Sequence, residues 1–332
     1  MKKTKRIGFI SDDLKPYNDA WASTRLRVYN VINHFKKKYF LRYKLEIYNE
    51  SQKYDAVIFQ KAYFGEFLTI AKKLKNQGTL IIFDINIDVF ALEADIGIFN
   101  EEQIQKINQM KKDIKDMLNL ADCIIVSSEH LQQIYSQYNK LTFLIEEAIE
   151  DKFIKTNKIH ENTDMINLLY NGYSKKAKDI SLISEILIEL QNKYKNLNLL
   201  FVSDQKPEID FIPNTFIKFN FKTVHKSFLR GDIKIAPRDL SVPYNLGHAL
   251  SKVAYPMAVG LPVVASPVPS YLNRGITICR SDEEWYSALS NLIENYELRR
   301  IIGRRNKEYI KSNLTMKQVG KQYFELFNFL LN

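Results

Sequence analysis

One stretch in the second half of the chain combines a predicted helix start with basic and polar side chains. A helical run from about Leu246 to Val259 ends at Gly260-Leu261-Pro262, and the apolar run 263–265 follows at once. Glycine ends helices and proline cannot continue them, so the helix must pass directly into a buried strand. The first turn of a helix has free N–H groups and a positive dipole end, which favour phosphate. We therefore expect an anion site at Asn245, Gly247, His248 and Lys252, where Gly247 lets backbone approach the ligand closely.

Other polar residues follow predicted strands elsewhere. The stretch "NGYSKKAKDIS" begins at a strand end and supplies Gly172, Ser174 and Lys178, and Arg238 follows the strand-like "DIKIAP". These residues suit a phosphate, although a solvated lysine run before a helix is the alternative interpretation of "SKKAK". In the first half, Arg25 and Arg27 follow "SDD" near a helix start. Residues two apart on a helix point in different directions, so we expect only Arg25 to face a ligand.

Two carboxylates follow another predicted strand in "FDINID", at Asp84 and Asp88. Asp88 is a candidate base or contact to hydroxyl groups, and an N-cap role is the competing interpretation. No His/Cys cluster has metal-ligand spacing, so we expect no metal site. A glycine-rich dinucleotide fingerprint is missing after the first strand, and so is a Walker loop, which disfavours a dinucleotide enzyme.

These residues need elements that bring strand ends together. Short apolar strands alternate with amphipathic helices along the whole chain, which predicts an α/β fold with parallel sheets covered on both faces. The pattern restarts after the polar stretch "EDKFIKTNKIHENTD". We predict two doubly wound, Rossmann-like domains facing each other across a cleft, over residues 1–158 and 159–315, with a final helix at 316–332 returning to the first domain. Ligands of such sheets lie outside the carboxyl ends of the strands.

Composition adds information about partners. The 332 residues carry a formal net charge of +10, and residues 1–50 hold 12 Lys and Arg against 5 Asp and Glu. A basic surface attracts phosphates of a membrane, a nucleic acid or a small ligand, and a solvated lysine-rich surface is the plainer interpretation. Cys123 and Cys279 lie in apolar runs, as expected of reduced core cysteines in a cytoplasmic protein. No apolar run approaches the length of a membrane span.

Residues 252–266, "KVAYPMAVGLPVVAS", resemble the motif K-L-L-E-A-M-A-A-G-L-P-V-V-A-S of the group 1 (family 4-like) GT-B glycosyltransferases. The resemblance is specific over about 230–310 and extends to the domain pattern elsewhere. It implies the GT-B fold, a nucleotide sugar bound on the second domain, and an acceptor on the first. It further implies a metal-independent reaction that retains anomeric configuration and needs no cofactor beyond the donor substrate.

The resemblance also implies roles for individual residues. Lys252 and Lys178 would contact the donor diphosphate, and Arg238 and His248 would be further phosphate or base contacts. The motif usually includes two glutamates eight residues apart, and here their positions are taken by Gly247 and Tyr255. Tyr255 is a candidate ribose contact, with simple core packing as the alternative. The proline at 256 should kink the helix.

The sequence therefore predicts a glycosyltransferase that moves a hexosyl or pentosyl group to a glycan, a lipid-linked sugar or a nucleic acid. One alternative is a phage-type enzyme that glycosylates a hydroxymethylated DNA base. The other is a catalytically silent GT-B subunit that only binds, which the two missing glutamates would explain. We expect a cytoplasmic location with peripheral contact to an anionic membrane through the basic stretch "NHFKKKYFLRYK".

Overall fold

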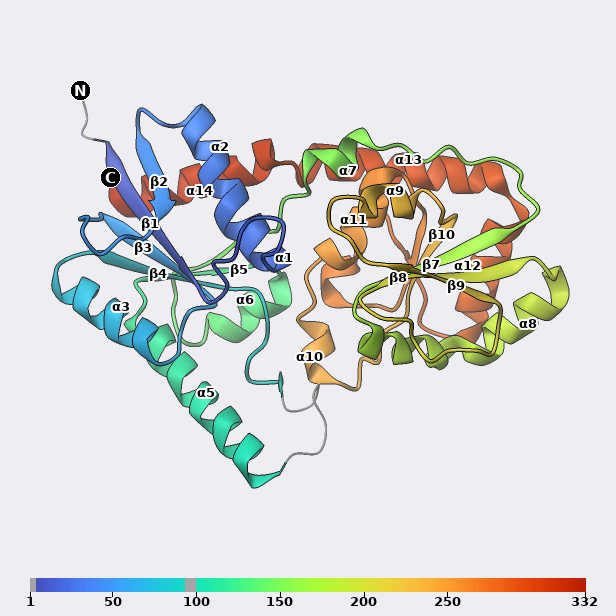
Figure 1. Ribbon diagram of the computed structural model, residues 1–332, viewed down its shortest axis with the longest axis horizontal. Coiled ribbons are helices and arrows are strands. Elements are labelled where there is room, and N and C mark those ends of the chain that lie inside the picture. Colours follow the sequence, from blue (N-terminus) through green and yellow to red (C-terminus); the bar gives the residue numbers. More distant parts are fainter. Residues whose placement is uncertain (1–3, 93–99) are drawn as a thin grey trace. The chain divides into compact units, whose positions relative to one another are not determined.

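The computed structural model describes residues 4–92 and 100–332. By its contacts the chain divides into two compact units (Figure 1). Unit 1 comprises residues 1–148, 242–249 and 316–332, and unit 2 comprises residues 149–241 and 250–315. The first boundary thus lies about ten residues before the position predicted from the sequence, and residues 242–249 are grouped with unit 1.

Unit 1 is built on a six-stranded parallel sheet with the order β2-β1-β3-β4-β5-β6. Alternate residues of its central strands point to opposite faces, as in Val57 and Phe59 against Ala56 and Ile58, and all four are buried. Both faces are therefore apolar and both need helices. The strands are β1 Lys5–Ser11, β2 Tyr43–Ile47, β3 Ala56–Gln60, β4 Leu80–Ile85, β5 Cys123–Val126 and β6 Thr142–Leu144.

Helices cover both faces of the unit 1 sheet (Figure 1). The first face packs against α3 (Glu66–Asn76), α5 (Glu101–Leu120) and α6 (Glu129–Tyr135). The second face packs against α2 (Asn30–Lys38) and α14 (Met316–Leu331), the C-terminal helix. A short α1 (Ala22–Thr24) and a π-helical turn (Arg25–Tyr29) run directly into α2.

A buried ion pair connects the elements that pack on this second face. Nε of Arg27 donates to Oδ1 of Asp84 at 2.7 Å, and both side chains are almost fully buried. Nη1 of Arg27 donates to the carbonyl of Ile145 at 2.8 Å, and the Tyr323 hydroxyl of α14 donates to Oδ2 of Asp84 at 3.4 Å. A buried charge is tolerated only when it is paired in this way. Arg27 and Asp84 are therefore core residues of unit 1.

Unit 2 has a second six-stranded parallel sheet, in the order β12-β11-β10-β7-β8-β9. Read from β9, the order is that of a Rossmann sheet. The strands are β7 Ile166–Asn171, β8 Leu197–Ser203, β9 Asn214–Lys218, β10 Ile233–Ala236, β11 Val263–Ala265 and β12 Thr277–Ile278.

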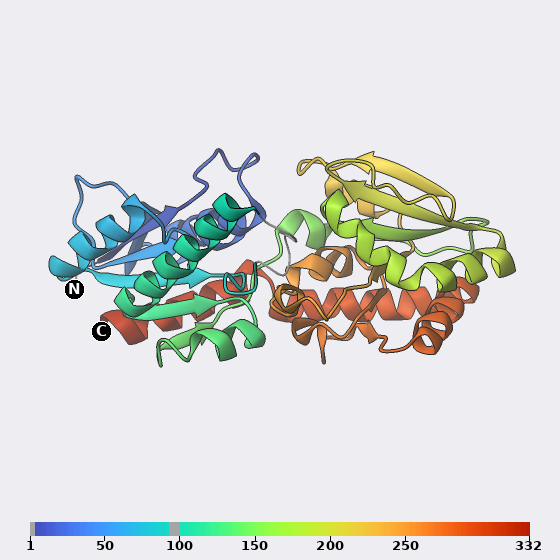
Figure 2. The same ribbon diagram turned by 90° about the horizontal axis from the view of Figure 1, so that it is seen from below.

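One core of unit 2 joins the sheet to α8 (Ser184–Tyr194) and α12 (Asp282–Glu294). The other helices are α7 (Asp151–Lys155), α9 (Val224–Phe228), α11 (Ser251–Val259) and α13 (Tyr296–Asn313). Figure 2 shows α13 running lengthwise along unit 2. A 3-10 helix, Ser174–Ile183, precedes α8.

The chain passes directly from α11 into β11, as the sequence predicts. Gly260 adopts a left-handed conformation with φ of 97°. Its N–H donates hydrogen bonds to the carbonyls of Met257 and Pro256. Few residues other than glycine adopt this φ without strain. The start of the helix differs from the prediction, because the structure places a separate short helix, α10 (Pro243–Leu246), before a break and begins α11 only at Ser251. The predicted helix start at Leu246 is therefore wrong.

Candidate functional site

The strand order of unit 2 places a site between β7 and β10. From β7 the chain continues to β8 on one side of the sheet, while β10 lies on the other side of β7, and ligands of such sheets bind outside the carboxyl ends of the two strands at this point. Gly172 and Ser174 follow β7, and Arg238 follows β10. Sequence reasoning therefore selected residues at the topological switch point of the sheet.

Arg238 is held rigidly at this point. Its Nη1 donates to Oδ2 of Asp179 at 2.8 Å and to the carbonyl of Lys176 at 3.4 Å, and its backbone N–H donates to Oγ of Ser266 at 2.8 Å. The Arg238 and Asp179 side chains are only 9% and 6% exposed. The guanidinium thus connects the segments after β7 and β10, and the Arg238 backbone amide connects the segment after β11 to them.

Three lysines share this electrostatic neighbourhood. Burial, together with the charge of Arg238, lowers the pKa of Lys176 to about 8, and Lys178 and Lys252 contribute to the same shift. The carboxylate of Asp179 opposes it. Lys252 is exposed in the first turn of α11, and Lys178 is exposed in the 3-10 helix. Lys252, Lys178 and Arg238 were predicted, whereas Lys176 was not selected although it is the most deeply buried of the three lysines in its helix.

Two buried tyrosines and a buried lysine lie near Arg238. Burial raises the pKa of Tyr271 to about 12, and it does the same for Tyr170, whose hydroxyl donates to the carbonyl of Tyr173 at 2.9 Å. Nζ of Lys234 lies 5.1 Å from the centre of the Tyr170 ring. Burial moves the pKa of Lys234 well below its usual value, with Arg238 adding to the shift. Asp179 and Asp204 are the carboxylates that add to the rise in the pKa of Tyr170.

The backbone beside the lysines is also ordered. The N–H of Ser174 donates to Oδ1 of Asp204 at 2.8 Å, which fixes the start of the 3-10 helix next to the exposed Gly172. Both residues lie at the carboxyl end of β7, as predicted, although the Ser174 amide is already satisfied within the chain.

Asn245, Gly247 and His248 are placed differently from the prediction. They lie in α10 and the turn after it, within the segment grouped with unit 1, and not in the first turn of α11. A Cβ atom at position 247 would lie 3.1 Å from Cδ2 of Leu131 and 3.4 Å from Cβ of Asp88. A larger residue at position 247 would therefore require the Leu131 side chain to shift.

Tyr255, at the second glutamate position, packs against an aromatic neighbour. Its ring centre lies 4.4 Å from that of Phe153 in α7, at an interplanar angle of 50°. The side chain is half-buried on α11, whose interior accommodates Pro256. Core packing accounts for the ring, and the ribose contact stays a prediction.

In unit 1, Arg25 and Asp88 mainly contact backbone. Nη1 of Arg25 donates to the carbonyl of Ala20 at 2.6 Å, and the side chain is 6% exposed. Oδ1 of Asp88 accepts from the amides of Phe90 at 3.0 Å and Ala91 at 3.3 Å. Burial raises the pKa of the Asp88 carboxyl, and the two amides oppose that shift. These are the contacts of a turn over residues 88–91, and the N-cap and base roles considered for Asp88 stay predictions.

A second set of polar residues lies at the switch point of unit 1, where β1 and β3 end side by side. Oγ of Ser11 donates to Oε1 of Gln60 at 2.9 Å. Burial raises the pKa of the adjacent Asp12, opposed by Lys61, whose Nζ lies 4.7 Å from the Trp21 ring centre. Lys61 has a positive φ of 57°. Gln60 and Lys61 lie at a strand end, where ligands of such sheets are expected, although the sequence analysis gave neither residue a role of its own.

The described residues, 4–92 and 100–332, contain no group of three or more metal-ligating side chains placed to hold an ion. In the same part of the chain, no helix is both long enough and apolar enough to cross a bilayer.

Comparisons with known proteins agree with this architecture. An uncharacterized glycosyltransferase of Methanocaldococcus jannaschii is 27% identical over 202 residues, which are 57% of this chain and 50% of that protein. The chain thus spans about half the length of the curated relative that it matches. No protein-family model matches the chain.

Solved structures resemble the chain over nearly its whole length. A glycosyltransferase of Rickettsia africae has a TM-score of 0.65 at 10% identity and covers 100% of both chains. WaaG, a glycosyltransferase involved in lipopolysaccharide biosynthesis, has a TM-score of 0.65 at 10% identity and covers 97% of this chain and 99% of its own. An α-glucosyltransferase in complex with UDP-glucose and abasic DNA has a TM-score of 0.60 at 10% identity, covering 98% and 100%.

These likenesses show the fold, and with the two doubly wound units they define the class: the chain has the fold of the GT-B glycosyltransferases. The motif at residues 252–266 resembles that of the group 1 type, and the curated relative is itself named a glycosyltransferase.

Proposed function

We propose that this chain is a glycosyltransferase that takes a sugar from a nucleoside diphosphate donor bound by unit 2. One observation carries the proposal: Arg238, Lys176, Lys178 and Lys252 share one electrostatic neighbourhood at the switch point of a Rossmann sheet. A diphosphate is the anion that this type of crevice binds in other doubly wound folds. Asp179 is the neighbouring carboxylate, and its ion pair with Arg238 directs it toward the protein.

The same cations supply the chemistry. When the bond from the sugar to the diphosphate breaks, negative charge develops on the departing phosphate oxygen. Fixed cations stabilise that charge more than they stabilise the bound donor, and so they lower the barrier. In this proposal Lys252 and Lys176 contact the departing diphosphate, and Arg238 keeps both neighbouring segments in place. In this proposal the cationic side chains stabilise the departing diphosphate, as a metal ion does in other transferases. Retention of anomeric configuration is proposed from the group 1 resemblance.

Unit 1 would bind the acceptor. Asp12, Gln60 and Lys61 lie at the carboxyl ends of its strands and suit acceptor hydroxyls. The proposed acceptor is a lipid-linked or membrane-bound glycan, because the basic helix end Lys36–Lys38 is followed by Phe40 and Leu41, which are 58% and 74% exposed. Apolar side chains beside lysines suit the surface of an anionic bilayer.

DNA is the second candidate acceptor. The observation that favours it is the fold shared with an α-glucosyltransferase solved with UDP-glucose and DNA, together with the basic first 50 residues. The phosphates of duplex DNA would contact the lysines, but the exposed apolar side chains would be left without a partner. A silent binding subunit remains the non-catalytic alternative, supported by Gly247 and Tyr255 at the glutamate positions.

The test is a panel of nucleotide sugars incubated with the purified chain, with released nucleoside diphosphate as the readout. We expect one donor to be hydrolysed slowly without acceptor, and equally well in the presence of a chelator. A donor that binds but is never turned over, with any acceptor fraction, would favour the silent subunit. Activity that a chelator abolishes and manganese or magnesium restores would refute the metal-independent mechanism.

A further inference from the structure

Unit 2 contains a second cationic site, at the edge of its sheet opposite to the proposed donor site. A cavity of about 570 Å³ lies between the segment 154–160, Gly260 and the helix α13. Segment 154–160 precedes β7, and Gly260 precedes β11, so the cavity is at the amino edge of the sheet. Gly260 and Lys252 are eight residues apart along α11, which separates the cavity from the proposed donor site by about 12 Å. The volume is typical of a small-molecule site.

The lining of the cavity is strongly basic. It includes six cations and one carboxylate, Glu308. Four of the cations repeat along one face of α13, at positions three or four residues apart. Like charges at this spacing destabilise a helix. Such a stripe is expected where an anion offsets the repulsion. The cations are Lys155, Lys158, Arg300, Arg304, Lys307 and Lys311.

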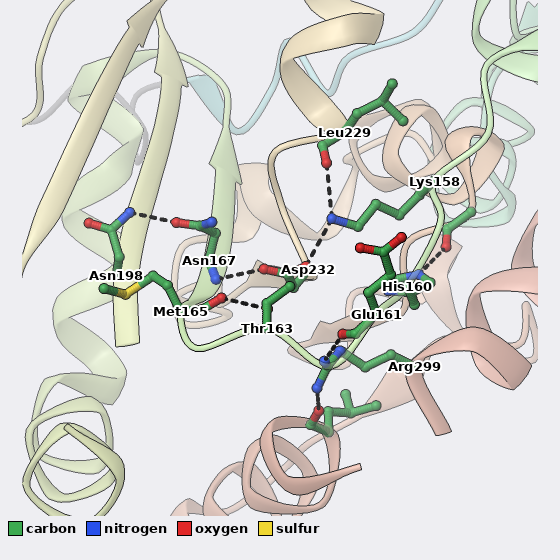
Figure 3. Close-up of polar contacts among 12 residues, drawn as sticks. Lys158, His160, Glu161, Thr163, Met165, Asn167, Asn198, Leu229, Asp232 and Arg299 are labelled. Atoms are coloured by element: carbon green, nitrogen blue, oxygen red, sulfur yellow. Dashed lines mark hydrogen bonds and ion pairs between the residues drawn. The ribbon is translucent and has the colours of Figure 1, made fainter. Parts of the chain in front are cut away.

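Two of these cations are structural and fix the shape of the cavity. Nζ of Lys158 lies 2.9 Å from Oδ1 of Asp232 and donates to the carbonyl of Leu229 (Figure 3). Lys307 donates to the carbonyl of Thr156 and to Oδ1 of Asn157. Burial and the nearby Lys311 lower the pKa of Lys307.

The other cations are available to a ligand. Arg304 is exposed, and no described residue forms an ion pair or hydrogen bond with its guanidinium. Lys311 and Arg300 each pair only with an exposed glutamate on their own helix, Glu308 and Glu297, and such exposed pairs are weak. The cavity thus has mobile cations at its mouth and fixed ones inside.

A buried histidine also lies at the cavity, and burial lowers its pKa, which favours the neutral ring. His160 is 7% exposed, and its Nε2 bonds the carbonyl of Gly260 at 2.9 Å (Figure 3). Its Nδ1 is buried and has no hydrogen-bond partner among the described residues. Because Nε2 donates to the Gly260 carbonyl, Nδ1 of the neutral ring is an acceptor, and it suits a hydroxyl group of a ligand. His160 lines the cavity.

We propose that this cavity is a second anion site that binds a phosphate-bearing molecule, with Arg304 and Lys311 as its principal contacts. The phosphate group fits because arginine binds it through a planar fork and lysine through a point charge. The phosphate belongs either to a soluble phosphorylated compound or to a lipid headgroup. The proposal does not depend on the glycosyltransferase function.

The test uses inorganic pyrophosphate as the probe and calorimetry as the readout. The starting protein is the variant Lys176→Gln/Lys252→Ala. It lacks two lysines of the proposed donor site, so pyrophosphate should no longer bind there. We expect this variant to bind pyrophosphate at one site, and the further changes Arg304→Gln and Lys311→Gln to weaken that binding by about tenfold or more. A matched control adds Lys317→Gln and Lys321→Gln, two exposed lysines of α14 that lie outside the cavity lining, and should bind as the starting variant does.

A starting variant that binds no pyrophosphate would overturn the proposal, as would equal affinity with and without Arg304 and Lys311. Thermal melting establishes that each variant is folded, and the single reversal Arg304→Glu provides a second test, with the same weakening expected. Cosedimentation with phosphatidylglycerol vesicles separates the two sources: binding that is lost with Arg304 and Lys311 identifies a lipid headgroup. If all variants bind vesicles equally, while pyrophosphate binding still depends on Arg304 and Lys311, the natural ligand is a soluble compound.

Discussion

Arg238 and Asp179 form an ion pair of 2.8 Å that joins the carboxyl end of β10 to the 3-10 helix after β7. Both side chains are nearly buried. The pair therefore positions two of the segments that carry the proposed diphosphate contacts, while it directs the nearby carboxylate away from the anion.

Replacing Asp179 with Asn should destabilise unit 2 by about 3 kcal/mol, because the Arg238 charge would remain buried without its partner. Urea unfolding of the purified variant measures this effect. Asp210→Asn is the control, since Asp210 is exposed on the same unit. Equal unfolding midpoints for Asp179→Asn and the parent protein would show that the ion pair is dispensable.

Donor affinity should fall as the pH rises above about 8. The pKa of Lys176 in the free protein is about 8, below the usual lysine value. A bound diphosphate favours the protonated amine, so above this pH binding must first take up a proton. We expect the KM for the donor to rise by up to about tenfold per pH unit from 8 toward 10.

Lys176→Arg tests the origin of that dependence, because arginine stays charged throughout this range. Its KM should vary much less between pH 8 and 10. A profile identical to that of the parent would assign the proton to another group.

Gly303→Ala should destabilise unit 2 by at least about 1–3 kcal/mol. A Cβ atom at position 303 would lie 2.0 Å from the carbonyl oxygen of Gly260 and 3.1 Å from Nε2 of His160. The first neighbour is backbone and cannot rotate away, so α11 and α13 would have to separate. Thermal melting compares this variant with Ser312→Ala, an exposed position on α13. An unchanged Tm would contradict the close helix contact.

The triple variant of Lys36, Lys37 and Lys38 to Gln should bind anionic vesicles much more weakly than the parent. Each lysine contributes roughly 1 kcal/mol near an anionic leaflet. Lys72, Lys73 and Lys115 are exposed on α3 and α5, and their replacement with Gln removes the same charge elsewhere on unit 1. A parent protein that binds duplex DNA but no vesicles would move the acceptor proposal to DNA.

The sequence predicts the architecture well, because periodicity and capping are local properties. Gly260 ends α11 as expected, and Oγ of Ser128 caps α6 by accepting the N–H of Leu131 at 3.3 Å. The break between α10 and α11 was missed because a single glycine inside a helical pattern is usually tolerated. Here Gly247 lies against Leu131 and Asp88, which are distant in sequence.

The site was predicted less completely, for two physical reasons. Lys178 was preferred to Lys176 on the offset seen in related proteins, but the segment is a 3-10 helix with three residues per turn, which changes the side each lysine faces. Only the fold reveals that Arg27 meets Asp84 in the core, while Arg25, the preferred candidate, contacts the carbonyl of Ala20. Long-range partners of this kind leave no local pattern.

The most direct measurement is the turnover of the Lys252→Ala variant with whichever nucleotide sugar the parent protein uses. Lys252 lies in the first turn of α11 beside Arg238 and Lys176, and it is exposed, so its removal should leave the fold intact. We predict that kcat falls by about 100-fold or more, as expected for the loss of a fixed charge at a developing anion, while Lys321→Ala keeps the parental rate. Near-parental turnover by a folded Lys252→Ala variant would contradict the assignment of this cationic cluster as the donor site.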